Sequence, residues 1–353
     1  MSQFHQKLSL AFLVILSLGM ILFIGSSFFI KPKVIEITSL PAQVSENLPN
    51  INLPDQSEII TLILVGDIML DRGVEYMMKT EGNGDFRFPF SKIAKDLKKA
   101  DILFGNLEGP ISGKGIKVGS IYSFRAEPKA IEGLTFAGFD VISLANNHAF
   151  DYGREALEDT FLRLKTAGVD YVGAGFNEEE AFSPVIKEVN GSTGSPQAKI
   201  GFLAYTNLGP ESWKAGEKNS GIAWISEEDI ERIKKDIENS KSQANILIVS
   251  LHAGEEYAAE PTQFQIEFSK AAIDAGADLV IGHHPHVVQK SEKYKDKWIF
   301  YSLGNFVFDQ GFSEETMRSE IIEVLIAESK IKEVKSKLIK MNNYFQPKIY
   351  EGL

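Results

Sequence analysis

The chain of 353 residues contains no cysteine, only six histidines, and more acidic than basic side chains. The lack of cysteine excludes disulfides and thiolate ligands, so any metal ion must be held by nitrogen and oxygen atoms. The net charge of -11 argues against nucleic acid as a partner, because a phosphate backbone attracts basic surfaces. A polyanionic ligand would need local arginine or metal to offset the repulsion.

Charge is also absent from a long stretch near the amino terminus. Residues 8–30 carry no charged side chain, and a helix of this length exceeds the roughly 30 Å hydrocarbon core of a bilayer. A signal peptide is the alternative, but its apolar region is usually about 7 to 15 residues long and ends in a small-x-small cleavage site. We therefore expect an uncleaved transmembrane anchor at residues 8–30, after a short leader at residues 1–7.

The orientation of this anchor does not follow from charge alone. Lys7 precedes the span and Lys31 and Lys33 follow it, so the positive-inside count does not decide between the two sides. A short leader followed by most of the chain is typical of a signal anchor. We therefore expect a single-pass protein of the cell membrane with its large domain on the extracellular side.

The rest of the chain divides into three segments. Residues 31–57 contain four prolines with serine, asparagine and glutamate, which predicts an extended linker. From residue 58 to residue 327, apolar runs alternate with amphipathic helices, for example at 154–166 and 227–239, and this pattern predicts one large α/β domain. Residues 328–353 are rich in lysine and alternate in polarity, so we expect a peripheral strand or helix there.

Three of the six histidines lie within four positions, as His283, His284 and His286. They directly follow the apolar run 278–281 and a glycine. Imidazole is a common neutral ligand for divalent metals, and a strand that stops at a glycine can direct the next side chains into a shared cavity. This segment therefore predicts a metal site at the end of a strand.

Four other apolar runs also end in residues of the ligand type. They are Asp67 after residues 60–65, Asn106 and Glu108 after residues 101–104, Asn147 and His148 after residues 139–144, and His252 after residues 245–251. A single residue of this kind is more often a structural histidine, a turn or a helix cap. Five such segments in one chain favour a metal centre, because helix caps do not need imidazole.

Six motifs occur in a fixed order between residues 58 and 327. They are Gly66-Asp67, Asn106-Leu107-Glu108, Asn146-Asn147-His148 with Asp151 and Gly153, His252-Ala253-Gly254-Glu255-Glu256-Tyr257, Gly282-His283-His284-Pro285-His286 and Tyr301-Ser302-Leu303-Gly304-Asn305-Phe306. Together they resemble the CapA family of capsule synthesis proteins, which belongs to the calcineurin-like metallophosphoesterase superfamily and is associated with poly-γ-glutamate capsules. The resemblance implies a four-layer α/β/β/α sandwich with metal ions at the carboxyl ends of the strands.

The resemblance also implies two divalent metal ions, which could be manganese, zinc or iron. Asp67 would be a ligand of the first metal, and Asn147 and His252 would be ligands of the second. His284 and His286 would be divided between the two. His148, which follows Asn147, would then be the general acid that protonates a leaving oxygen.

Two positions depart from the superfamily pattern. Met69 stands where a histidine ligand is expected, and Asn106 stands where an aspartate bridges the two metals. A thioether is a poor ligand for a hard or borderline divalent metal, and a neutral amide bridges less well than a carboxylate. Glu108 is the expected replacement for the bridge, because residues two apart in an extended segment point to the same side.

Other residues have roles that the sequence leaves open. The candidates for alternative ligands, or for residues that orient the ligands, are Asn106, Asp151, Glu255, His283 and Asn305. The neighbouring Glu256 could likewise bind a metal or orient a ligand. Glu255 and Glu256 could equally be solvated. Arg125 could clamp an anionic substrate with its guanidinium, or form a surface salt bridge. The segment 301–308 is expected to be a late core strand, or a plain turn at Asn305.

Two functions fit these features. In the first, the protein is a membrane-anchored metallohydrolase that acts on a phosphate ester or on a bond of an anionic polymer such as poly-γ-glutamate. In the second, the metal site is structural, and the protein is a scaffold that holds the polymer beside membrane subunits of a capsule synthesis complex. Met69 and Asn106 favour the second function, whereas the Asn147-His148 pair favours the first.

Overall fold

The computed structural model describes residues 59–118, 120–190 and 196–350. The predicted leader, membrane anchor and linker lie outside these residues. Within the described part of the chain, no helix is both long and apolar enough to span a membrane.

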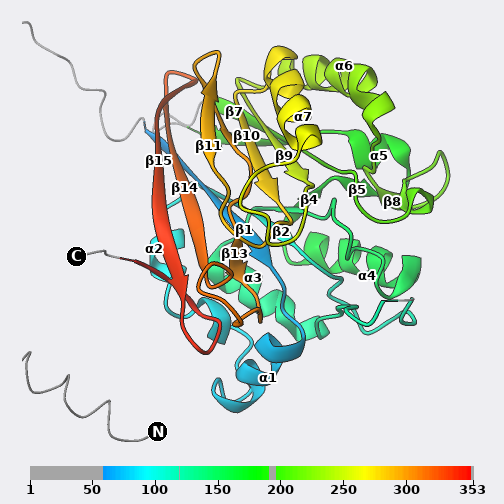
Figure 1. Ribbon diagram of the computed structural model, residues 1–353, viewed down its shortest axis with the longest axis vertical. Coiled ribbons are helices and arrows are strands. Elements are labelled where there is room, and N and C mark those ends of the chain that lie inside the picture. The colour runs from blue at the N-terminus through cyan, green and yellow to red at the C-terminus, as the bar shows by residue number, and fades with distance from the viewer. Residues whose placement is uncertain (1–58, 119, 191–195, 351–353) are drawn as a thin grey trace, which may run out of the picture. The chain divides into compact units, whose positions relative to one another are not determined.

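The first of two large sheets has eight strands (Figure 1). Their order is β16-β15-β14-β1-β2-β3-β4, and β13 pairs with β1. The strands are β1 (Ile60–Ile68), β2 (Ile102–Leu107), β3 (Val141–Ser143), β4 (Asp170–Val172), β13 (Asn305–Val307), β14 (Arg318–Ala327), β15 (Lys330–Met341) and β16 (Pro347–Ile349). Strands β1 to β4 and β13 run parallel, so their carboxyl ends meet at the same edge of the sheet.

The second sheet has six strands in the order β11-β12-β10-β9-β7-β6. They are β6 (Val185–Asn190), β7 (Pro196–Thr206), β9 (Ile246–His252), β10 (Leu279–His283), β11 (Ser291–Tyr294) and β12 (Lys297–Phe300). Strands β7, β9, β10 and β12 are parallel. A small sheet pairs β5 (Ala174–Gly175) with β8 (Gly221–Ile222).

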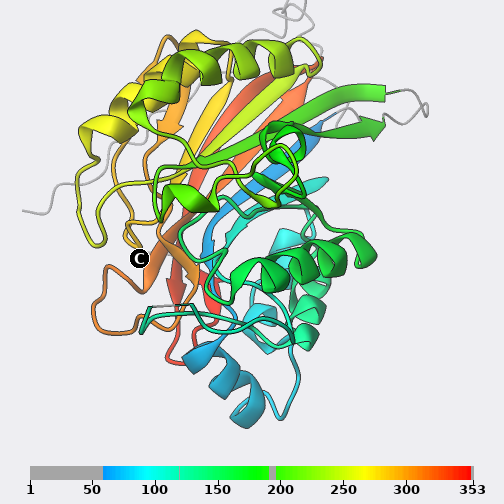
Figure 2. The same cartoon turned by 90° about the vertical axis from the view of Figure 1, so that its right-hand side faces the viewer.

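Helices cover the outer face of each large sheet, as Figure 2 shows. The α-helices are α1 (Arg72–Thr80), α2 (Ala94–Leu97), α3 (Ile131–Ala137), α4 (Gly153–Thr166), α5 (Glu178–Phe182), α6 (Ile230–Lys241) and α7 (Gln263–Asp274), and the 3-10 helices are η2 (Phe88–Phe90), η3 (Pro128–Ala130), η4 (Glu211–Trp213) and η5 (Glu227–Asp229). One core packs α1 to α4 against the first sheet, and another packs α5 to α7 against the second. The predicted helices at 154–166 and 227–239 correspond to α4 and to η5 with α6.

The two sheets face one another across a third core. Leu62 and Leu64 of β1 point into it, whereas Ile63 and Val65 point towards the helices on the other side. The rings of Phe104 from the first sheet and Phe202 from the second stack with their centroids 5.3 Å apart. Strands buried on both faces need unbroken apolar runs, and this requirement explains the run that begins β1.

The late strand expected over residues 301–308 is present only as β13 (Asn305–Val307), and Gly304 before it has a positive φ angle of 71°. Strand β12 ends at Phe300 in the second sheet, and β13 begins at Asn305 in the first. Residues 301–304 therefore carry the chain from one sheet to the other. Because they cross between the sheets, they cannot pair with the strands of one sheet along their whole length. The apolar pattern continues across this crossing because both sheets bury their strands.

Residues 330–349 form two strands of the first sheet, where the sequence had left a strand or a helix open. Strand β15 pairs with β14 from Arg318 to Ala327, and β16 continues the sheet beyond it. Ile339 and Met341 are buried against the helices of the first sheet. This segment therefore contributes to the core as well as to the edge of the sheet.

Candidate metal centre

The predicted ligand residues of both sheets come together at the carboxyl ends of the parallel strands. Asp67 of β1 lies opposite both Asn106 of β2 and Asn305 of β13 in the strand register. In the second sheet, His252 at the end of β9 lies opposite His283 at the end of β10. The carboxyl ends of parallel strands are a common place for a site in an α/β fold.

Two glycines allow the sheets to approach here. A Cβ atom on Gly66 would lie 1.9 Å from the carbonyl oxygen of Gly304, and one on Gly282 would lie 1.9 Å from that of Tyr301. The backbone N–H of Asp67 donates to the Gly304 carbonyl at 3.0 Å. The crossing segment 301–304 therefore packs directly against the residues that precede Asp67 and His283.

Asp67 is fully buried and is surrounded by donors. Its Oδ1 accepts from the Asn106 amide at 2.9 Å and from His283 Nδ1 at 3.1 Å, and its Oδ2 accepts from the backbone N–H of His284 at 3.2 Å. Burial by itself would raise the pKa of Asp67, but hydrogen bonds from His283 and His286 hold this pKa well below its usual value. Asp67 is therefore an ionised carboxylate in a fixed orientation.

Asn106 acts as a hydrogen-bonding support. Its amide nitrogen also lies 3.2 Å from His252 Nδ1, and its oxygen accepts from Asn146 at 3.2 Å. An amide that donates to His252 Nδ1 leaves the proton of the ring on Nε2, which then donates to Asn147 Oδ1 at 2.8 Å. A metal ion held by His252 Nε2 and Asn147 Oδ1 would take the place of that proton.

Glu108 is a buried carboxyl group without a hydrogen-bond partner among the described residues. The ring nitrogens His148 Nε2 and His252 Nε2 lie 3.9 and 4.0 Å from its oxygens. Burial, together with the negative charge of Asp67, raises the pKa of Glu108 well above its usual value.

His284 and His286 lie on the loop after β10 with positive φ angles of 96° and 60°. Such backbone strain is uncommon outside glycine and tends to occur at functional sites. His286 Nδ1 lies 2.9 Å from Asn305 Oδ1, whose own amide nitrogen donates to Gln310 and to the carbonyl of Thr316. Asn305 therefore holds the proton of His286 on Nδ1 and leaves its Nε2 able to bind a metal.

His148 is oriented by Asp151. Its Nδ1 lies 2.8 Å from Asp151 Oδ2, which also accepts from the backbone N–H of Phe124 at 2.7 Å. The ring of Phe124 packs against the His148 ring, with the centroids 4.1 Å apart. This arrangement directs His148 Nε2 towards Glu108 and the other ligand residues.

A cavity of about 510 Å³ opens beside these side chains. Its wall includes Asn147, His148 and His286, which leaves them accessible to a ligand. Arg72 and Asp309 also line the cavity and form an ion pair. They lie far apart in the sequence, so no local pattern could predict this pair.

Two predicted residues lie away from this wall. Arg125 donates to the carbonyls of Lys114 and Gly115 and stacks over the ring of Tyr152, so its guanidinium is engaged with its own loop. Glu255 is exposed, whereas its neighbour Glu256 lines the cavity. The sequence placed both glutamates after His252 but had no signal to choose between them.

Met69 lies outside the ligand cluster. It is fully buried in the core of the first sheet, where its sulfur accepts from the backbone N–H of Asp71. Asn146, in contrast, connects Asn106 to the backbone N–H of His148. The sequence showed Asn146 within its motif but gave it no separate role, because asparagine after a strand is common in turns.

The donor set fits a divalent metal. Asp67, Glu108 and His252 each offer an atom within 4.8 Å of the others, and all three residues are buried. Burial lowers the pKa of His252 well below its usual value and that of His284 to about 3, so both rings are neutral near pH 7. The buried, unpartnered atoms of Glu108, His283 and His284 are the kind that a bound cation satisfies.

The fold and this site define an α/β protein of two facing sheets with a candidate metal centre at the carboxyl ends of its parallel strands. A phosphatase from Mycoplasma pneumoniae superposes with a TM-score of 0.50 at 16% sequence identity, over 80% of this chain and 94% of that one. At this identity, the likeness shows the fold alone.

The chain belongs to the bacterial capsule synthesis protein family PGA_cap, whose model matches residues 61–310. It is 36% identical over 262 residues to the capsule biosynthesis protein CapA of Bacillus anthracis. The aligned region covers 73% of this chain and 62% of that protein. It is 33% identical over 259 residues to the PGA biosynthesis protein CapA of Bacillus subtilis, with 72% of this chain and 65% of that protein covered. The chain thus spans slightly less than two thirds of each relative's length.

Proposed function

We propose that this protein is a metal-dependent hydrolase of capsule polymer synthesis, acting on a phosphate ester or on a bond of poly-γ-glutamate. The observation that carries the proposal is the buried carboxylate of Glu108, which lacks a hydrogen-bond partner among the described residues and faces His148 and His252. Ionising this buried carboxyl is costly, as its raised pKa reflects, and a divalent cation beside it would favour the ionised form.

The ligands in this proposal are those expected from the sequence. They are Asp67, Glu108, Asn147, His252, His284 and His286, which would hold two divalent ions. Bound ions of this kind would polarise a phosphoryl or carbonyl group and provide a nucleophile near neutral pH. Asn106, Asn146 and Asn305 would orient the ligands through the hydrogen bonds described above.

His148 would supply the proton that a leaving oxygen requires. Asp151 accepts the Nδ1 proton and would stabilise the charged ring, so the Nε2 proton could be given to the substrate. Because His148 lines the cavity, its Nε2 can reach a bound substrate.

Location and partners complete the proposal. The uncharged span at residues 8–30 would anchor the chain in the cell membrane, and the linker at 31–57 would hold the domain on the extracellular side. Membrane subunits of a capsule synthesis complex would then be its neighbours. The names of the two relatives, which refer to capsule and PGA biosynthesis, support only the part of the proposal that concerns capsule polymer synthesis.

A second candidate is a non-catalytic scaffold whose metal site is structural. It is favoured by Asn106, a neutral amide that donates to Asp67 and to His252 where a bridging carboxylate is expected. A site of this kind would bind metal without hydrolysis.

Metal content separates these candidates from a protein without metal. We would measure metal per chain by elemental mass spectrometry on the full chain, purified without chelator. Two ions per chain are expected, with fewer in Asp67→Ala and Glu108→Gln, because each substitution removes a charged ligand. Glu217→Gln, which changes an exposed carboxylate outside the cavity, is the matched control and should retain both ions.

Hydrolytic activity of the metal-loaded protein is measured next. The hydrolase proposal would be supported if the protein released phosphate from esters, or shorter chains from poly-γ-glutamate. This activity should be lost in His148→Asn, while the variant retains its metal. Bound metal without either activity would favour the scaffold. A chain that takes up no metal even after addition of Mn²⁺ or Zn²⁺ would refute the metal centre.

A further inference from the structure

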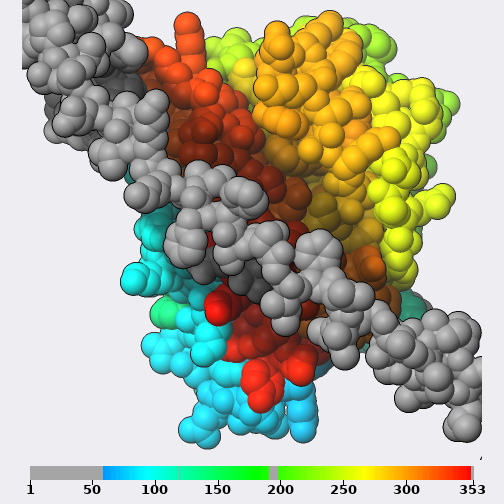
Figure 3. All heavy atoms as spheres, turned by 60° about the vertical axis from the view of Figure 1, so that its left-hand side comes forward, coloured from blue at the N-terminus to red at the C-terminus, as the bar shows by residue number. Residues whose placement is uncertain are grey.

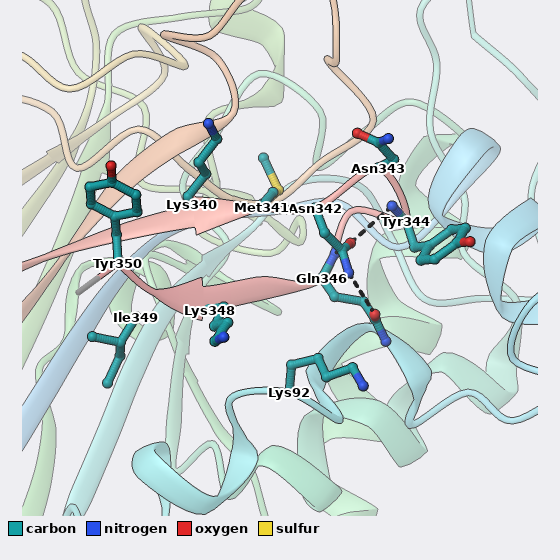
Figure 4. Close-up of a pocket in the computed structure, with 10 residues that line it drawn as sticks. All are labelled: Lys92, Lys340, Met341, Asn342, Asn343, Tyr344, Gln346, Lys348, Ile349 and Tyr350. Atoms are coloured by element: carbon teal, nitrogen blue, oxygen red, sulfur yellow. Dashed lines mark hydrogen bonds between the residues drawn. The ribbon is translucent and has the colours of Figure 1, made fainter. Parts of the chain in front are cut away.

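A second, larger cavity lies at the outer end of the first sheet (Figure 4). Its volume is about 930 Å³, and it is lined by Lys92, Lys340, Met341, Asn342, Asn343, Tyr344, Gln346, Lys348, Ile349 and Tyr350. None of these is a candidate ligand of the metal centre. In Figure 3, the red residues of this region lie against the cyan residues that follow α1.

The turn between β15 and β16 is held firmly in place. Asn342 Oδ1 accepts from the backbone N–H groups of Tyr344 and Gln346 at 2.9 and 3.0 Å. The side chain of Gln346 is buried and donates to the Phe88 carbonyl at 2.8 Å and to Ser91 Oγ at 2.9 Å. The cavity is therefore a fixed feature of the fold, built between this turn and the segment that carries Lys92.

The charges of this cavity are all of one sign. Lys340 and Lys348 are directly opposite one another on β15 and β16, and Arg318 is opposite Lys340 on its other side. Arg318 is paired with Glu314, whereas no ion pair joins Lys92, Lys340 or Lys348 to another residue of the described ranges. No acidic side chain lines the cavity among the described residues, which stop one residue short of Glu351.

This pattern differs from that of three other lysines of β15, although Lys330 at the start of the strand also has no ion pair among the described residues. Lys332, Lys335 and Lys337 are each paired, in that order with Glu328, Glu333 and Glu323. Like charges that face one another across two strands destabilise a sheet. In a chain of net charge -11, an unpaired basic group of this kind indicates a place for an anion.

The backbone of β16 adds a second feature. It is the last strand of its sheet, so one side of its backbone has no partner strand. An unpaired strand edge offers N–H and carbonyl groups to the amide groups of another chain. A ligand that combines amides with negative charges would therefore use both the edge and the lysines.

We propose that this cavity binds a segment of an anionic polyamide whose charges are carboxylates. Lysine ammonium groups pair with carboxylates as well as with phosphates, so the lysines call for an anion, and the free strand edge favours one that also carries amide groups. The choice of poly-γ-glutamate as this polyamide rests on the proposed function. The site itself rests on the cavity, the unpaired lysines and the free edge.

The cavity is close to the metal centre. Gly304 bridges to Ser319 of β14, Ser319 pairs with Ile339 of β15, and Lys340 is the next residue. Two strand spacings of about 4.8 Å place the backbone of β15 roughly 10 Å from that of Gly304. A short polymer segment held at Lys340 and Lys348 would keep its neighbouring units near the hydrolytic site.

Binding of fluorescently labelled poly-γ-glutamate to the full chain tests this proposal by fluorescence anisotropy. The variant Lys340→Gln/Lys348→Gln should bind about tenfold more weakly at low ionic strength, and its binding should depend less on salt. Lys218→Gln/Lys235→Gln removes the same charge from exposed positions outside the cavity and should bind as the parent chain does.

A charge reversal provides an independent readout. Lys348→Glu should abolish binding and raise the melting temperature of the ligand-free chain, because the repulsive pair with Lys340 becomes attractive. A purely structural role of Lys348 would lower the melting temperature instead, and that result would overturn the proposal.

Other outcomes also decide the matter. Unchanged polymer affinity in the double variant would overturn the proposal, as would tighter lysine-dependent binding of polyphosphate or of anionic lipid vesicles. Asp67→Ala separates this test from that of the proposed function. Its polymer binding should persist when metal is lost, so the cavity can stand even if the hydrolase proposal fails.

Discussion

His252 and His284 show how burial prepares single residues for metal binding. Both rings lie in the protein interior, and burial is the main reason why their pKa values fall. A neutral imidazole keeps a lone pair for a cation, so the fold provides metal ligands at neutral pH without any further deprotonation.

The low pKa of His284 predicts an acid-sensitive metal-free protein. A histidine in the unfolded chain titrates near 6.5, whereas His284 in the folded chain titrates near 3. Between these values the unfolded state binds more protons, so stability is complete above pH 6.5 and falls as the pH approaches 3. We expect His284 to account for a loss of roughly 2 kcal/mol between pH 6.5 and 5.

Urea unfolding of the chelator-treated full chain measures this effect. The pH dependence of the free energy of unfolding should be weaker in His284→Asn than in the parent protein. The raised pKa of Glu108 has the opposite effect on the pH dependence of stability. Because both proteins contain Glu108, this effect cancels when their pH profiles are compared. Identical pH profiles would show that His284 is not buried as a neutral ring.

Residue types and positions could be predicted here, but side-chain partners could not. Asp67, His252 and His286 were expected at strand ends, and the structure places them together. Arg125 was expected to face an anion, yet its guanidinium is occupied by carbonyls of its own loop. Such a partner depends on the path of the loop, which carries no periodic pattern in the sequence.

At the scale of elements, the crossing segment 301–304 controls how the two sheets meet. It passes beside Gly66 and Gly282, which precede residues of the metal centre in each sheet. The sequence predicted the strands that lead to the metal centre from their apolar runs, but it extended β13 backwards to residue 301 and into the crossing segment. A run of buried residues does not reveal that the chain has changed sheets, because both sheets are apolar on both faces.

Gly66→Ala should therefore disturb the metal centre as well as the fold. The new methyl group would lie 1.9 Å from the Gly304 carbonyl oxygen, so the backbone must shift and the hydrogen bond from Asp67 N–H to that oxygen must weaken. We expect a loss of at least about 2 kcal/mol in the free energy of unfolding. Chemical denaturation and metal content of the same sample measure both effects.

Gly113→Ala is the control for this substitution. Gly113 is exposed, and a Cβ atom there would meet the nearest atom at 3.6 Å, an ordinary contact. This variant should retain stability and metal. If Gly66→Ala retained both as well, the close approach of the crossing segment would not be needed to position Asp67.

At the scale of the whole molecule, the metal centre needs both sheets. Asp67 and Asn106 come from the first sheet, whereas His252 and His283 come from the second, so no single sheet contains the site. The core between the sheets fixes their distance. Any change that loosens either sheet should therefore lower metal affinity, even when it lies far from the ligands.

Removal of β15 and β16 tests this dependence. A chain that ends at Ala327 would leave β14 as an unpaired edge of ten residues and would remove Ile339 and Met341 from the core. We expect it to aggregate, or to melt at least about 10 °C below the full chain, and to lose metal. Circular dichroism and elemental analysis measure these outcomes.

The matched control removes only residues 351–353 and should behave as the full chain does. Strand β14 lies beside β1 and contacts the crossing segment through Ser319 and Gly304, so a free β14 edge should affect Asp67 indirectly. A stable, metal-binding chain that ends at Ala327 would contradict this coupling. It would show that the metal centre depends on the strands from β1 to β14 alone. Strands β15 and β16 would then serve only the cavity that Lys340 and Lys348 line.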